Sequence, residues 1–118
     1  MEKILIVEDE WIESTEIQGM IEDLGYEVID VVDNGEAAIE SVSEVEPDLI
    51  LMDIRLGEGM SGIETVKTLR EDYEVPVVYL TAHSDEDTLS RAKETDPEGY
   101  LVKPITTDDL RSTLQLIL

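Results

Sequence analysis

The fold class of this 118-residue chain is decided by residues 48–53, which read DLILMD. Consecutive apolar residues between two aspartates are typical of a strand covered on both faces, as in a parallel sheet, because a half-buried strand alternates polar and apolar positions. Residues 77–81, which read VVYLT, form a second run of this kind directly after Pro76. The two runs therefore predict two buried strands of a parallel sheet.

Strand-like and helix-like segments alternate along the rest of the chain. Apolar residues at positions 17, 20, 21 and 24 have the i, i+3, i+4, i+7 spacing of an amphipathic helix. Further strands are expected at residues 3–8, 27–32 and 100–103, and helices at 11–24, 35–45, 62–72, about 85–95 and from Thr107 onward. Because crossovers between parallel strands are right-handed, this order predicts an α/β fold, a three-layer doubly wound sandwich of five parallel strands with five helices.

Several residues indicate where these elements begin and end. Gly25 is expected to end the first helix, and Ser84 or Asp85 to cap the fourth. Thr107 is the expected cap of the last helix. The run at 27–32 is more polar than the others, which favours an edge position in the sheet.

The composition limits the classes of protein that this chain can represent. Its 30 acidic and 8 basic residues give a formal net charge of −22, which argues against direct nucleic-acid binding because that requires a basic surface. No cysteine is present, so disulfides and thiolate metal sites are excluded. No signal peptide and no membrane-spanning run is visible, so we expect a cytoplasmic protein. Residues 1–118 are expected to form one domain, with no output domain.

Chemically special residues directly follow four of the predicted strands. Glu8 and Asp9 follow the first strand, Asp53 the third, Thr81 the fourth and Lys103 the fifth. In open α/β sheets, sites form outside the carboxyl ends of the parallel strands. We therefore expect three acids, a hydroxyl and a lysine to meet at one edge of the sheet, where they could transfer a phosphoryl group to a carboxylate with the help of a divalent metal.

The three acids form a candidate metal site. Carboxylates this close together would repel one another unless a cation lay between them, and Mg²⁺ is the expected cation, with Mn²⁺ as a substitute. The backbone carbonyl of Arg55 could supply a further oxygen ligand. The alternative is that Glu8, Asp9 and Asp53 are solvated loop acids in a very acidic protein. Each acid alone favours this alternative, whereas their joint placement at strand ends favours a site.

Asp53 is the candidate nucleophile, because carboxylates form aspartyl phosphates by attack on an activated phosphoryl donor. Such a transfer depends mainly on positioning and charge neutralisation. Lys103 could supply a positive charge, and Thr81 a hydroxyl for a phosphoryl oxygen. The bond between Lys103 and Pro104 lies at this edge, and base rates favour the trans form for it.

These motifs resemble the receiver domain of two-component response regulators over essentially the whole chain. The matching segments are residues 7–10 (VEDE), 48–54 (DLILMDI), 62–64 (GIE), 80–82 (LTA) and 99–104 (GYLVKP). The resemblance implies a flavodoxin-like strand order of 2-1-3-4-5. It also implies that the chain catalyses only its own phosphorylation and dephosphorylation, and that its partners are a sensor histidine kinase or phosphotransfer protein and an unknown effector or attached domain. Homodimerisation is left open.

The resemblance also implies a role for each site residue. Asp53 would accept the phosphoryl group, Asp9 would bind Mg²⁺ directly and Glu8 would act mainly through water. Thr81 and Lys103 would contact the phosphoryl group. The surface around the fourth helix, fifth strand and fifth helix would then change.

The resemblance extends to residues around the phosphorylation site. Tyr100 would be a switch residue whose ring turns inward when Thr81 is drawn to the phosphate, and Pro104 would follow a cis peptide bond. Arg55 and His83 could modulate hydrolysis, or be simply solvated. The loop at residues 55–62 departs from the family, because it lacks the usual proline and is one residue longer.

Two other functions compete with a phosphorylation switch. A small Mg²⁺-dependent phosphatase with an aspartyl-phosphate intermediate would also need Asp53, but such enzymes usually carry a second acid where this chain has Arg55. A phosphorylation-independent interaction domain would not need all five site residues. Trp11 is expected to be a packing residue.

Overall fold

The computed structural model describes residues 2–82 and 86–118. Five parallel strands form one sheet in the order β2-β1-β3-β4-β5, which confirms the predicted fold and strand order. The strands are β1 (Lys3–Val7), β2 (Glu27–Val32), β3 (Leu49–Asp53), β4 (Val77–Thr81) and β5 (Gly99–Val102). Since β2 lies at one edge, the position predicted from its polar composition is also confirmed.

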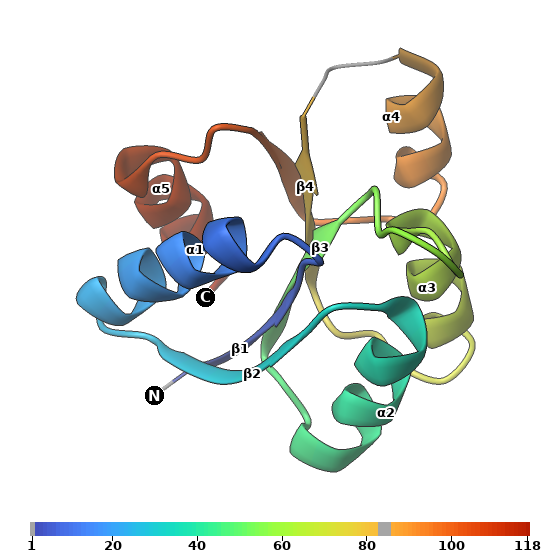
Figure 1. Cartoon of the computed structure of the whole chain (residues 1–118), viewed down its shortest axis with the longest axis horizontal. Helices are drawn as coiled ribbons and strands as arrows, with labels where there is room; N and C mark the ends of the chain where they lie inside the picture. The colour runs from blue at the N-terminus through green and yellow to red at the C-terminus, as the bar shows by residue number, and fades with distance from the viewer. Residues whose placement is uncertain (1, 83–85) are drawn as a thin grey trace.

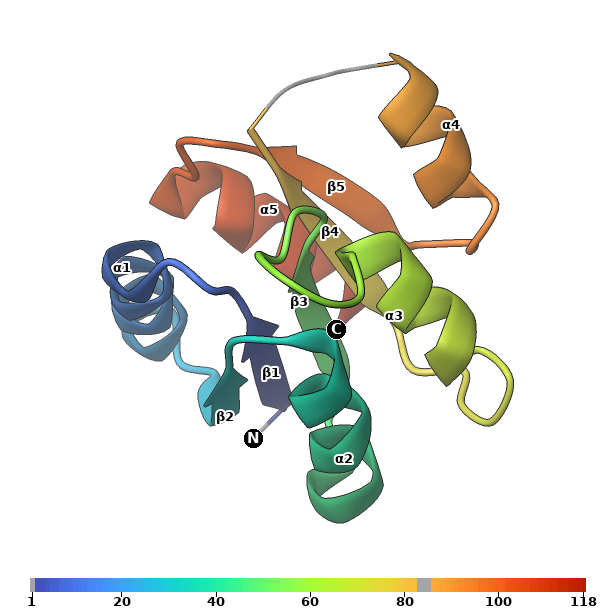
Figure 2. The same cartoon turned by 45° about the vertical axis from the view of Figure 1, so that its right-hand side comes forward.

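Helices cover both faces of this sheet (Figures 1 and 2). They are α1 (Trp11–Asp23), α2 (Gly35–Val45), α3 (Gly62–Leu69), α4 (Glu86–Lys93) and α5 (Thr107–Ile117). Helices α1 and α5 pack on one face through residues such as Ile17, Ile21 and Leu110. Helices α2, α3 and α4 lie on the other face, where Val42, Val66 and Ala92 join the core.

The two apolar runs form the centre of the molecule. Every residue of β3 and of β4 is buried, because each strand has a neighbour on both sides and helices on both faces. Alternate residues of these strands belong to different cores: Ile50 faces the α2–α3–α4 side, whereas Leu51 faces the α1–α5 side. The continuous apolar sequence thus reflects burial on both faces, as predicted.

The helix ends agree with the sequence in part. Gly25 follows α1 with a φ of 94°, a left-handed conformation that suits glycine. The prediction that Thr107 caps α5 was wrong, because the side chain of Thr106 accepts a hydrogen bond from the backbone N–H of Asp109. Helix α3 ends at Leu69 rather than at residue 72. The predicted caps Ser84 and Asp85 lie outside the described residues.

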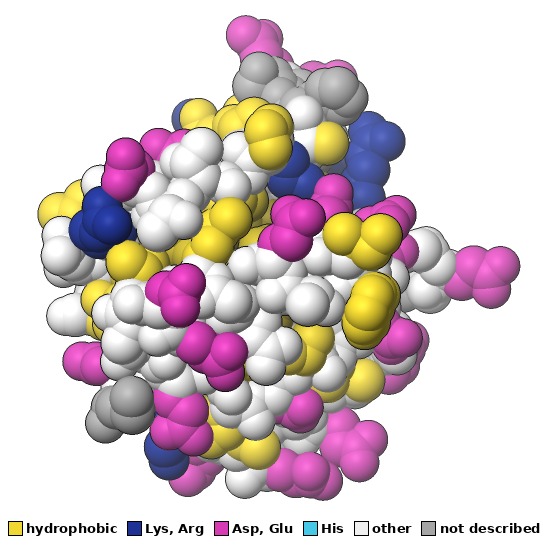
Figure 3. Space-filling view, turned by 60° about the vertical axis from the view of Figure 1, so that its left-hand side comes forward, with side chains coloured by type: hydrophobic (Ala, Val, Ile, Leu, Met, Phe, Trp, Pro, Cys, Tyr) yellow, Lys and Arg dark blue, Asp and Glu magenta, His cyan; other side chains and the backbone are white. Residues whose placement is uncertain are grey.

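The surface is acidic over a wide area rather than at one patch. Figure 3 shows Asp and Glu side chains spread over one face, with hydrophobic side chains between them. Trp11 is 77% exposed at the start of α1, so the prediction that it is a packing residue was wrong. Among the described residues, no helix has the length and apolar character needed to cross a membrane.

Candidate functional site

The register of the sheet brings the predicted residues to one edge. Val7 of β1 pairs with Met52 of β3, so Glu8 and Asp53 leave neighbouring strands at the same level. On the other side, Asp53 pairs with Leu80, and Thr81 pairs with Val102 of β5. The strand ends therefore place Glu8, Asp53, Thr81 and Lys103 side by side.

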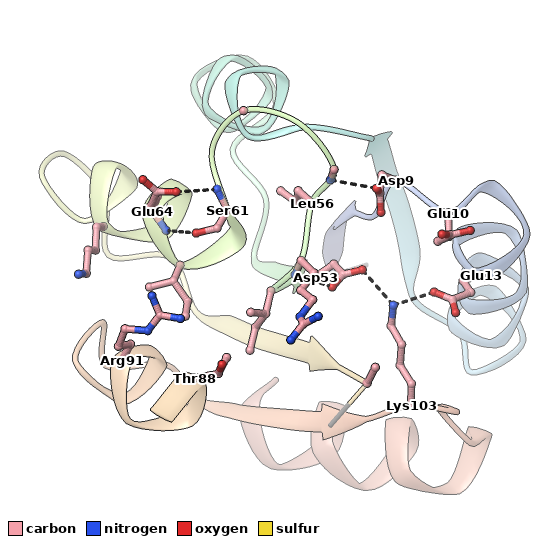
Figure 4. A pocket seen from close by; sticks show the side chains of 17 residues that line it. Asp9, Glu10, Glu13, Asp53, Leu56, Ser61, Glu64, Thr88, Arg91 and Lys103 are labelled. Carbon is pink, nitrogen blue, oxygen red and sulfur yellow. Dashed lines mark hydrogen bonds and ion pairs between the residues drawn. The ribbon is translucent and has the colours of Figure 1, made fainter. Parts of the chain in front are cut away.

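Lys103 lies at the centre of this group (Figure 4). Its Nζ lies 2.6 Å from Oε1 of Glu8, 2.7 Å from Oε2 of Glu13 and 2.9 Å from Oδ2 of Asp53. The side chain of Glu8 is fully buried and that of Asp53 is only 6% exposed. One ammonium group thus binds three carboxylates in a largely water-excluded position.

Glu13 was missed by the sequence analysis. It lies in the first turn of α1, and its carboxylate lies beside those of Glu8 and Asp53 at the edge where β1 ends. An acid in the first turn of a helix that starts at this edge is the signal that could have identified it. Oxygens of Glu8, Glu13 and Asp53 all lie within 4.8 Å of one another, and this group could hold a metal ion.

The charges of this cluster shift the pKa values of its members. Burial, reinforced by hydrogen bonds to Asp53 and Glu13, raises the pKa of Glu8 to about 9. Hydrogen bonds with Glu8 and then Lys103 lower the pKa of Glu13. Burial opposes the charged form of Lys103, but its bonds to Glu13, Glu8 and Asp53 outweigh this and raise its pKa. Lys103 therefore remains an ammonium, and without a metal Glu8 retains a proton near neutral pH.

Asp53 is fixed through both carboxylate oxygens and through its backbone. Oδ1 accepts a hydrogen bond from the backbone N–H of Arg55 at 2.9 Å, while Oδ2 accepts one from Lys103. The backbone of Gly62, at the start of α3, passes so close that a Cβ there would lie 2.0 Å from the Asp53 carbonyl oxygen. Glycine at position 62 thus allows α3 to begin directly behind the carboxylate.

Asp9 is placed differently from Glu8. It is exposed, and its Oδ2 accepts a hydrogen bond from the backbone N–H of Gly57 at 3.0 Å. Asp9 is therefore absent from the close oxygen group of Glu8, Glu13 and Asp53, although it lines the same cleft. This hydrogen bond ties the proline-free loop at residues 55–62 to the end of β1.

The end of this loop is fixed by a capping box. The side chain of Ser61 accepts a hydrogen bond from the Glu64 N–H, and the Glu64 carboxylate accepts one from the Ser61 N–H. The bond from the Ser61 backbone also lowers the pKa of Glu64. The loop is thus held at both ends, by Asp9 and by the first turn of α3.

The remaining predicted residues differ in their burial. Thr81 is buried at the end of β4, whereas the side chain of Arg55 is exposed. Tyr100 is 49% exposed on β5. The peptide bond between Lys103 and Pro104 is cis. His83 lies outside the described residues.

Asp53, Arg55 and Lys103 line an open cleft of about 780 Å³. Its α1 side carries Asp9, Glu10 and Glu13, and its opposite side is formed by α3 and α4 with Lys67 and Arg91. Figure 4 shows Asp53 and Lys103 between these two walls. The arrangement gives a hard cation only oxygen ligands, and it gives an anionic group access to a lysine and a buried carboxylate.

Fold and site together define a flavodoxin-like α/β domain with an acidic site and a lysine ammonium at the carboxyl edge of its sheet. The sequence model of the response regulator receiver domain matches residues 4–115. The chain belongs to this family, whose members are signalling domains rather than enzymes in the usual sense.

Individual relatives agree with this assignment. The transcriptional regulatory protein YdfI of Bacillus subtilis is 33% identical over 115 residues, which are 97% of this chain and 54% of YdfI. The chain thus spans about half the length of that relative. The receiver domain of sensor histidine kinase PA1611 from Pseudomonas aeruginosa, solved with magnesium in its active site cleft, is 31% identical with a TM-score of 0.89, covering 98% of this chain and 96% of that one.

A third relative is a protein of nearly the same length. Chemotaxis protein CheY4 of Vibrio cholerae is 29% identical with a TM-score of 0.92, and the match covers 100% of this chain and 99% of that one.

Proposed function

We propose that this receiver domain is a phosphorylation-dependent switch in which Asp53 accepts a phosphoryl group from a sensor histidine kinase or a phosphotransfer protein. The observation that carries the proposal is the buried Asp53 carboxylate, held at the end of β3 by Lys103 and the Arg55 N–H. A carboxylate oxygen of Asp53 forms the bond to phosphorus, and the bond from phosphorus to the donor nitrogen breaks with its electron pair leaving on the donor.

The residues at this edge fit Mg²⁺, with Mn²⁺ as a substitute. The candidate ligands are Asp53, Asp9, Glu8 and the backbone carbonyl of Arg55, which offer oxygens only, the ligand type that these cations require. When bound, the cation neutralises charge on the phosphoryl oxygens. Two observations support this proposal. The carboxyl groups of Glu8 and Asp53 lie close together around the Lys103 ammonium, and the PA1611 receiver domain holds magnesium in its active site cleft.

The chain's own residues provide the rest of the mechanism. Lys103 offers its ammonium to a phosphoryl oxygen, and Thr81 lies at the neighbouring strand end with its hydroxyl. Binding of Thr81 to the phosphoryl group alters β4, the strand that carries Thr81. Tyr79 of the same strand pairs with Tyr100 of β5. We propose that this connection changes the surface of α4, β5 and α5, which an effector, an attached domain or a second copy of the chain reads. The strong negative charge disfavours nucleic acid as the direct partner.

The proposal is tested by incubation with Mg²⁺ and acetyl phosphate, followed by intact-protein mass spectrometry. We expect one phosphoryl group per chain, lost in Asp53→Asn, which removes the nucleophile but keeps the side-chain shape. Absence of the adduct in the wild-type protein would refute the proposal. Steady hydrolysis of many equivalents of a phosphomonoester would instead favour the phosphatase alternative.

A further inference from the structure

The ammonium group of Lys103 has no free hydrogen-bond donor. It carries three N–H bonds, and these face the carboxylates of Glu8, Glu13 and Asp53 at 2.6, 2.7 and 2.9 Å. Before the new bond to phosphorus forms, Asp53 is still an anion that needs this lysine. An incoming phosphoryl oxygen is therefore a fourth acceptor for three donors, and one carboxyl group must leave.

Burial decides which carboxylate can leave at the lowest cost. The side chain of Glu8 is fully buried and that of Asp53 is 6% exposed, so either would remain as a buried polar group without its hydrogen-bond partner if it lost Lys103. Glu13 is 43% exposed and lies on the first turn of α1. Its carboxylate can rotate toward the solvent, where water solvates its charge. Glu13 is thus the partner that Lys103 exchanges.

We propose that Glu13 is a positioning residue that holds Lys103 beside Asp53 and competes with the phosphoryl group for its ammonium. This inference rests on the proposed function, because it concerns the same transfer to Asp53. Glu13 keeps the lysine in place in the unphosphorylated chain, and it slows phosphorylation because its bond to Lys103 must break first. If Glu13 were instead a third carboxylate ligand of the cation, the consequence would be opposite: loss of Glu13 would weaken cation binding and slow the transfer.

The test compares Glu13→Gln with Glu16→Gln, measured as the rate of phosphorylation by acetyl phosphate at saturating Mg²⁺. Glu16 is exposed on the same helix and forms no ion pair among the described residues, so it controls for the loss of one negative charge. We expect Glu13→Gln to raise the second-order rate constant about two- to fivefold, the range of a partly exposed ion pair, and Glu16→Gln to leave it nearly unchanged. Mg²⁺ affinity, measured separately by calorimetry, should remain unchanged.

A double-mutant cycle with Lys103→Met tests whether Glu13 acts through the lysine. The gain from Glu13→Gln should disappear in the Lys103→Met background, although that variant reacts slowly. A gain that persists there, an unchanged rate in Glu13→Gln, or a slower rate with weaker Mg²⁺ binding would each overturn the inference while leaving the proposed function intact. Failure of the wild-type chain to form the adduct would refute the proposed function and this inference with it.

Discussion

Strands β3 and β5 deliver residues to the same edge of the sheet, yet they differ sharply in burial. All five residues of β3 are buried, whereas in β5 only Leu101 is, and Tyr100 and Val102 are 49% and 44% exposed. The reason is position: β3 lies between β1 and β4, while β5 is the last strand of the sheet. Asp53 therefore ends a fully buried strand, whereas Tyr100 lies in, and Lys103 directly follows, a strand that faces solvent.

This comparison predicts very different costs for shortening side chains in the two strands. Leu51→Ala removes a fully buried side chain of β3 and should lower the free energy of unfolding by about 2–5 kcal/mol. Val102→Ala removes a half-exposed side chain of β5 and should change it by about 0.5 kcal/mol or less. Urea denaturation of both variants measures the difference, and equal losses would contradict the assignment of β3 as the central packed strand.

Gly62 tests how tightly the structure closes behind Asp53. Gly62→Ala forces a Cβ against the Asp53 backbone, so we expect a loss of about 1–3 kcal/mol in unfolding free energy together with slower phosphorylation. Gly19→Ala is the matched control, because nothing lies within 4 Å of its added Cβ in the middle of α1. That variant should gain about 0.5–1 kcal/mol from helix propensity. A neutral Gly62→Ala would show that α3 can move away from β3.

A pH-dependent effect concerns the contact in which Glu8, just after β1, meets Lys103, just after β5. With metal removed by a chelator, the folded chain keeps a proton on Glu8 up to about pH 9, whereas the unfolded chain loses it near the ordinary value of 4.5. The folded state then binds more protons than the unfolded state. The contribution of Glu8 to the free energy of unfolding is therefore complete below pH 4.5 and falls as pH rises toward 9.

Denaturant titrations at several pH values measure this contribution. Stability should fall by at most about 1.4 kcal/mol per pH unit from this one group, and Glu8→Gln should flatten the slope between pH 6 and 9. Identical slopes in the wild-type and variant chains would show that Asp53, Glu13 and Lys103 leave Glu8 ionised at neutral pH.

The sequence identified most of the site because strand ends leave a clear pattern. Asp53, Thr81 and Lys103 each follow an apolar run, and parallel strands must bring such positions to one edge. Glu13 gave no such signal, since it is one acid among many on an exposed helix. Trp11 was misjudged for the related reason that an apolar side chain packs only where neighbours exist: it is 77% exposed and belongs to neither core cluster of the described residues.

The sequence by itself therefore determined the alternation of strands and helices, the buried centre and the order of the chemical groups along the chain. Only the tertiary structure decided that Lys103 binds Glu13 as well as Glu8 and Asp53, and that Asp9 instead holds the loop through Gly57. The physical reason is the distance along the sequence over which each property is set. Periodicity and strand ends are local properties of the chain, whereas the partner of a charged side chain depends on elements up to 95 residues away.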